Sequence, residues 1–144
     1  MKVSRSALLP YSATQMYDIV TDIQSYPDFL NWCESVELLA EDEGEVIARL
    51  NISTAKLNLH FTTRNVNKPG ESITLTLVDG PFSQLTGQWQ FKALSHDACK
   101  VSVDMNFEFD RSLVPAVFGN VFGKLISMEL DAFQQRAQQL YGKA

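Results

Sequence analysis

The stretch Leu113–Tyr141, "LVPAVFGNVFGKLISMELDAFQQRAQQLY", decides the fold, because it predicts a helix long enough to cross a whole sheet. At 1.5 Å per residue, such a helix would run about 42 Å. We expect Ser112 to cap its start and Gly142 to end it, since these residue types favour those two positions. The rest of the chain must therefore supply a surface for this helix to cover.

The two halves of the predicted helix differ in polarity. Leu113–Gly123 carries no charge and is apolar on nearly every side, which is typical of a buried helix but also allows one flank to touch lipid. From Lys124 onward, an apolar stripe alternates with polar residues. The residues expected to face water in this half are Glu129, Asp131 and Arg136.

Between Cys33 and Asp110 the hydrophobic pattern has a period of two, which predicts β-strands. Turn residues divide this region, as in "EDEGE", "NKPGE" and "SHDA", and the short spacing favours an antiparallel meander. The predicted strands are Ser35–Ala40, Val46–Ser53, Lys56–Asn65, Ser72–Val78, Gln84–Ala93 and Lys100–Phe109.

One face of these strands is apolar and the other is polar, as in a sheet with one solvated side. The stretch "DGPFSQLTGQWQF", Asp79–Phe91, places large rings on the apolar side around Gly87. These rings could fill a solid core, or they could line a hollow one. Gly87 allows close approach to the backbone, either by the terminal helix or by a ligand.

The front of the chain predicts one strand and two short helices. "KVSRSALL" alternates as a strand does, and Ser12 with Gln15 forms a capping box for the helix that follows. Pro27 fits only the first turn of a second, short helix. The resulting order predicts a single α+β domain over residues 1–144, in which a seven-stranded antiparallel sheet curls around the terminal helix. This is the helix-grip architecture.

Composition and charge exclude several classes of protein. The 144 residues carry 17 acidic and 12 basic side chains, and the net charge of −5 argues against generic capture by nucleic acid or anionic lipid, so we expect no direct DNA binding. Cys33 and Cys99 lack CxxC spacing and are expected to be reduced thiols. No signal peptide or membrane span is read in the sequence, which predicts a cytoplasmic protein.

No group of residues predicts catalysis or metal binding. His60 should face away from the apolar side and His96 belongs to a turn, and neither has a readable Ser or Cys partner. The acidic turn Glu41–Glu45 lacks the spacing of a calcium loop. We therefore expect no enzyme activity, no metal and no cofactor.

Three stretches together resemble the START-like superfamily, in its coenzyme Q-binding and polyketide cyclase-like branch, which includes the bacterial ribosome association toxin subfamily. They are "YSATQMYDIVTDIQSYPDFLNWCESVEL", "DGPFSQLTGQWQF" and the "FEF…AFQQRA" ending, and the resemblance runs essentially end to end. Asn31 departs from it, because relatives typically have Pro between the Phe-Leu and Trp-Cys pairs.

The resemblance implies an apolar tunnel between the sheet and the terminal helix. The short helix would cover part of its mouth. The residues expected to line this tunnel or its mouth are Phe29, Leu30, Trp32, Leu57, Leu59, Phe61, Ile73, Leu75, Leu77, Leu85, Trp89, Phe91, Met105, Phe107, Phe118, Phe122 and Leu125.

The resemblance also implies two functions from different classes. The first is non-catalytic binding of a polyprenyl quinone of the ubiquinone type or a similar lipid, with the protein acting as carrier for respiration or quinone biosynthesis. Delivery would need transient contact with the inner membrane, for which Val117 and Val121 are the candidates. The alternative is a toxin of a toxin–antitoxin pair that binds the large (50S) ribosomal subunit and blocks subunit association. An aromatase or cyclase would need polar side chains inside the tunnel, where the expected lining is nearly all hydrocarbon.

Overall fold

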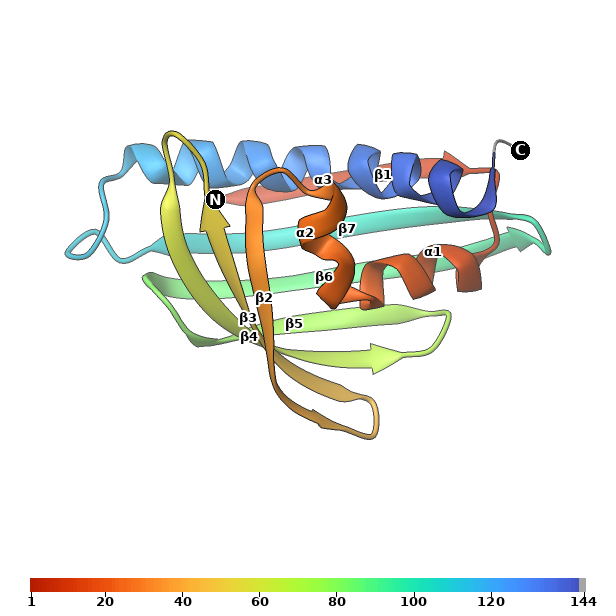
Figure 1. The fold of residues 1–144 in the computed structure, drawn as a ribbon, viewed down its shortest axis with the longest axis horizontal. Helices are drawn as coiled ribbons and strands as arrows, with labels where there is room; N and C mark the ends of the chain where they lie inside the picture. The colour runs from red at the N-terminus through yellow and green to blue at the C-terminus, as the bar shows by residue number, and fades with distance from the viewer. Residues whose placement is uncertain (143–144) are drawn as a thin grey trace.

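The computed structural model describes residues 1–142 and has the helix-grip architecture, in which a long helix lies along a curved sheet (Figure 1). The elements follow the predicted order of strand, short helices, six strands and long helix. They are β1 (Lys2–Leu9), α1 (Ala13–Thr21), the 3-10 helix η1 (Ile23–Ser25), α2 (Tyr26–Phe29), β2 (Cys33–Asp42), β3 (Glu45–Ser53), β4 (Asn58–Lys68), β5 (Ser72–Asp79), β6 (Phe82–Ser95), β7 (Ala98–Phe109) and α3 (Val117–Tyr141).

The seven strands form one antiparallel sheet in the order β1-β7-β6-β5-β4-β3-β2. Every strand from β2 to β7 pairs with its neighbour in sequence, which is the predicted meander, and β1 closes the far edge against β7. Gly44 and Gly70 turn two of the hairpins with positive φ, a conformation that glycine adopts without steric cost. The predicted fold class is therefore confirmed.

The short helices begin as the sequence predicts. The backbone N–H of Gln15 donates to Ser12 Oγ at 3.0 Å, and Gln15 Oε1 accepts from the backbone N–H of Ser12 at 2.9 Å, so the capping box of α1 is complete. Pro27 lies in the first turn of α2. Helix α1 contacts α3, β6 and β7 (Figure 1). Helix α2 contacts β2, and its Tyr26 and Phe29 rings pack against Phe133 of α3.

The long helix starts later than the sequence predicted. Helix α3 begins at Val117 rather than at Leu113, and Ser112 does not cap it. The backbone N–H and the hydroxyl of Ser112 instead donate to Asp110 Oδ1, at 2.9 and 2.6 Å, which closes a turn before the helix. The end is as predicted, because Gly142 terminates the helix with φ of 82°.

Helix α3 supplies the centre of the core. Phe133 is fully buried and its ring packs edge-on against Trp89, with 5.3 Å between ring centroids. Gly123 lets the helix approach the start of β1, because a Cβ there would lie 3.0 Å from the sulfur of Met1 and 3.6 Å from Cγ2 of Val3. The helix therefore packs closely on β1 at this point, while space remains nearer the middle of the sheet.

Candidate functional site

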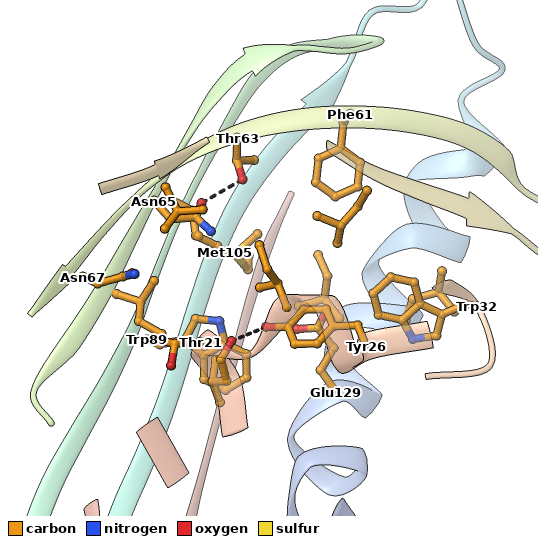
Figure 2. Close-up of a pocket in the computed structure, with 18 of the residues that line it drawn as sticks. Thr21, Tyr26, Trp32, Phe61, Thr63, Asn65, Asn67, Trp89, Met105 and Glu129 are labelled. Atoms are coloured by element: carbon orange, nitrogen blue, oxygen red, sulfur yellow. Dashed lines mark hydrogen bonds between the residues drawn. The ribbon is translucent and has the colours of Figure 1, made fainter. Parts of the chain in front are cut away.

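A cavity of about 70 Å³ lies between the middle of the sheet and α3, and we call it the inner cavity (Figure 2). Side chains from α1, η1, α2, most of the strands and α3 converge on it. It is lined by Val20, Thr21, Ile23, Tyr26, Trp32, Val46, Leu50, Phe61, Thr63, Asn65, Asn67, Ile73, Leu75, Trp89, Met105, Phe122, Leu125, Ile126 and Glu129. The interior is therefore hollow, but the hollow space is small.

The inner cavity is too small for a polyprenyl tail as it stands. A cavity of roughly 150 Å³ takes up a benzene molecule, so 70 Å³ holds less than one ring. A second space of about 560 Å³ lies outside it, the outer groove, which is lined by Phe29, Leu30, Asn31, Trp32, Ser53, Thr54, Leu125, Met128, Asp131, Ala132 and Gln135.

Trp32 and Leu125 line both spaces. These two side chains therefore form the wall between the inner cavity and the outer groove. Both are half-buried, so each has room to move that the fully buried core does not have. Displacing them would join the two spaces into one channel that leads to the surface.

One wall of the inner cavity is polar. Thr63, Asn65 and Asn67 occupy alternate positions of β4, so their side chains point to the same face, toward the cavity (Figure 2). Thr63 and Asn65 are buried, and the Thr63 hydroxyl donates to Asn65 Oδ1 at 2.8 Å. Asn67 Oδ1 is buried and has no hydrogen-bond partner within residues 1–142. The lining is therefore less apolar than the sequence interpretation expected.

Glu129 of α3 also lines the inner cavity, and the prediction that it faces water is wrong. Its side chain rises from the helix beside Tyr26 (Figure 2). Burial raises the pKa of this carboxyl to about 8, because the surrounding walls solvate a negative charge poorly. Of the other residues expected to face water, Asp131 is exposed, while the Arg136 guanidinium lies over the Phe29 ring at 5.1 Å.

Tyr26 and Cys33 are the titratable neighbours of Glu129. Burial raises the pKa of both, with the Glu129 charge as a further cause, and the pKa of Cys33 reaches about 11. The Tyr26 hydroxyl donates to the carbonyl oxygen of Val20. A thiol with such a raised pKa is a poor nucleophile, so Cys33 has the properties of a structural cysteine.

The structure places the predicted tunnel residues in three groups. Those that line the inner cavity are Trp32, Phe61, Ile73, Leu75, Trp89, Met105, Phe122 and Leu125. Phe29 and Leu30 line the outer groove instead. Those that line neither space are the buried Leu57, Leu85, Phe91 and Phe107 and the half-buried Leu59, Leu77 and Phe118.

The stretch Asp79–Phe91 both fills the core and lines the cavity. Phe82 stacks on Phe109 with 4.4 Å between ring centroids, whereas Trp89 borders the inner cavity. The group that approaches Gly87 is Met105 of the neighbouring strand, since a Cβ at Gly87 would lie 2.0 Å from its sulfur. Gly87 thus makes room for a side chain that also lines the cavity.

The sequence interpretation missed the polar wall, although the sequence contains its signal. The inward alternation of β4 that includes Phe61 continues without interruption through Thr63 and Asn65. Glu129 follows Ile126 by three positions and precedes Phe133 by four, which places it on the inward stripe of α3. In both cases the periodicity predicts the direction of the side chain, and polarity alone misleads.

The apolar start of α3 is partly exposed. Val117 is 59% exposed and Val121 is half-buried. The side chain of Val117 is therefore available to contact another surface. No helix within the described residues has the length and hydropathy that crossing a membrane would require. Residues 1–142 contain no cluster of three or more potential metal-ligating side chains.

Comparisons with known proteins agree with this fold. Residues 9–134 match the family described as polyketide cyclase / dehydrase and lipid transport. The ribosome association toxin RatA of Pseudomonas aeruginosa is 46% identical over 140 residues, which cover 97% of each chain. The mitochondrial coenzyme Q-binding protein COQ10 homolog B of Xenopus laevis is 28% identical over 147 residues, which cover 99% of this chain and 60% of that protein.

The crystal structure of the ZhuI aromatase/cyclase from Streptomyces sp. R1128 has the same fold, with a TM-score of 0.83 and 17% identity over 96% of this chain and 94% of that one. At that identity the likeness concerns the fold alone. The family match extends over most of the sequence, and the bacterial toxin aligns with it nearly end to end. The chain therefore belongs to the polyketide cyclase / dehydrase and lipid transport family.

Proposed function

We propose that this protein associates with the ribosome, as a toxin of the kind that its bacterial relatives are named for. The observation that supports this is 46% identity to the Pseudomonas aeruginosa RatA over 97% of both chains. The proposal includes the predicted site of action, the large subunit, and the predicted effect, a block of subunit association. With a net charge of −5, we expect contact mainly through ribosomal protein rather than through a broad basic surface on RNA.

Sucrose-gradient sedimentation tests this function. Purified protein incubated with separated ribosomal subunits should migrate with the large subunit, and it should reduce the peak of assembled ribosomes when the small subunit is added. A second sample in raised salt separates specific docking from weak electrostatic attraction. Protein that stays at the top of the gradient, with an undiminished peak of assembled ribosomes, would contradict the proposal.

A second function, binding of a lipid or quinone, is supported by the inner cavity itself. A space with mostly apolar walls and a few polar groups is the usual form of a small-molecule site. The coenzyme Q-binding relative, at 28% identity, is consistent with this. Burying apolar surface contributes about 25 cal/mol per Å², so a tail in the joined cavity and groove would add to affinity in proportion to its length.

Two matched variants test the binding function. Leu75 lines the inner cavity, and Leu77 is the next inward position of β5 but does not line it. We expect Leu75→Phe to fill the cavity and remove any lipid recovered by solvent extraction and mass spectrometry, while Leu77→Phe keeps it. Equal lipid content in both variants, with circular dichroism showing both folded, would contradict binding in this cavity.

Lipid delivery would need contact with a membrane, for which the exposed side chain of Val117 is the best-placed candidate. Replacing Val117 and Val121 with charged residues should weaken association with liposomes. Unchanged flotation with liposomes would remove this assignment. We also propose a binding role rather than catalysis, which the naming of the 46% identical relative as a toxin supports.

A further inference from the structure

The polar wall of the inner cavity presents nitrogen hydrogen-bond donors to the space. Asn65 Oδ1 already accepts the hydroxyl of Thr63, which leaves the Asn65 amide nitrogen to donate to something else. The amide nitrogens of Asn65 and Asn67 and the indole nitrogen of Trp89 point into the space (Figure 2). They come from β4 and β6 and lie on one side of the cavity. A ligand that offers an acceptor atom can therefore bind these nitrogens, beside which Asn67 Oδ1 is an acceptor without a partner in residues 1–142.

The charges around the cavity exclude an anionic ligand. No Lys, Arg or His is among the lining residues within 1–142, and the one acidic group is Glu129. A carboxylate or phosphate in this space would lose its hydration without meeting a cation, which is strongly unfavourable. It would also lie near a second acid. A neutral acceptor, such as a carbonyl oxygen, does not have this penalty.

We propose that Asn65, Asn67 and Glu129 form a head-group site that binds a neutral carbonyl compound and rejects anionic lipids such as fatty acids. The amide nitrogens of β4 donate to one acceptor oxygen of the head, and the protonated carboxyl of Glu129 donates from the α3 side. The apolar walls hold the body of the ligand, and any tail leaves past Trp32 and Leu125 into the outer groove. This inference rests on the proposed binding function and specifies its ligand class.

The head-group site has a pH dependence that follows from the role of Glu129 as a donor. Burial raises the pKa of Glu129 to about 8, so the donor form predominates at pH 7 and is lost at pH 9. The other titratable groups that face Glu129 are Tyr26 from α2 and Cys33 from β2, and burial raises the pKa of each. Both stay mainly neutral over this range. Binding of the carbonyl compound should therefore weaken about tenfold between pH 7 and pH 9.

Three single-ring probes of nearly equal shape test the inference by NMR titration of the full chain. Each probe is larger than the inner cavity and binds only when Trp32 and Leu125 are displaced into the outer groove. Acetophenone carries the neutral carbonyl, α-methylstyrene has a CH₂ group in place of that oxygen, and benzoate is the anion. We expect acetophenone to bind about tenfold more tightly than α-methylstyrene and to shift the signals of the Trp89 indole and the Asn65 and Asn67 amides. Benzoate should not bind. Equal binding of acetophenone and α-methylstyrene would overturn the head-group site but leave the apolar cavity as a binding site.

Variants on β4 and α3 complete the test. Asn67→Leu should remove the preference for acetophenone while α-methylstyrene still binds, and Asn58→Leu, an exposed position of the same strand, should leave the preference unchanged. Glu129→Gln should abolish the loss of binding at pH 9, because the amide donates at both pH values. Tight binding of benzoate, or a preference that survives Asn67→Leu, would overturn the inference. Failure of all three probes to bind would also contradict the binding function itself.

Discussion

Replacing Glu129 with Gln should make the protein more stable at neutral pH, by an amount that the burial of the carboxyl determines. The folded state raises the pKa of this group from 4.5 to about 8, so it holds the proton more tightly than the unfolded chain does. The contribution of Glu129 to the free energy of unfolding is therefore fully present below about pH 4.5 and is lost as the pH rises to about 8. At about 1.4 kcal/mol per pKa unit, this shift corresponds to a loss of about 5 kcal/mol in the free energy of unfolding. That figure is an upper limit, because water that enters the cavity would screen the charge.

The comparison between pH 5 and pH 7 isolates this effect. Over that interval, the wild-type protein should lose about 2–3 kcal/mol of unfolding free energy relative to Glu129→Gln, whose amide does not titrate. Urea denaturation followed by tryptophan fluorescence measures both proteins at each pH. Asp131→Asn removes an exposed carboxyl from the same helix and serves as the matched control. Its difference from the wild type should stay within about 0.5 kcal/mol at both pH values.

Parallel pH profiles of the wild type and Glu129→Gln would refute this reasoning. They would mean that Glu129 is solvated well enough to ionise in the folded protein near its ordinary pKa. The head-group site would then lose its acidic donor at neutral pH. Equal gains in Glu129→Gln and Asp131→Asn would instead assign the effect to net charge rather than to burial.

Three further predictions concern the backbone and the caps, and urea midpoints measure all of them. Gly119→Ala should stabilise the protein by about 0.5–1 kcal/mol, because the position is helical and a Cβ there has nothing within 4 Å; no gain would contradict the open space. Gly80→Ala should destabilise the protein by about 2 kcal/mol or more, since φ is +145° and the new Cβ would lie 2.8 Å from the Cβ of Phe61. An unchanged urea midpoint would contradict this close contact. Ser12→Ala should cost about 1 kcal/mol through loss of the capping box with Gln15, and a cost near zero would show that α1 does not depend on its cap.

Periodicity and turn chemistry predicted most of the fold, because both follow from local geometry. Alternating residues give strands, and the capping box and Gly142 mark helix ends that the structure confirms. The start of α3 was not predictable in the same way. Ser112 is a suitable cap by residue type, but its hydroxyl and backbone N–H donate to the carboxylate of Asp110 and close a turn before α3 begins.

The predicted tunnel shows a different limit of sequence reasoning. Period two identifies which side chains point inward, yet inward positions such as Leu85 and Phe107 pack against neighbours, while Trp89 borders the open space. The difference depends on how the sheet curves over α3, which is a long-range property. Thr63, Asn65 and Glu129 were missed for the opposite reason, since their inward positions were readable but their polarity suggested the surface.

The small volume of the inner cavity locates the part of the fold that has to move during binding. Even a single-ring ligand needs more than about 70 Å³, and the wall that yields must belong to an element with few deep contacts. Phe133 and Phe107 are fully buried in close-packed surroundings, so moving either would disturb the whole core. Trp32 and Leu125 are half-buried and have the outer groove on their far side. Their displacement costs less because it shifts side chains into existing space, and the cavity therefore opens toward α2 and the middle of α3 rather than through the sheet.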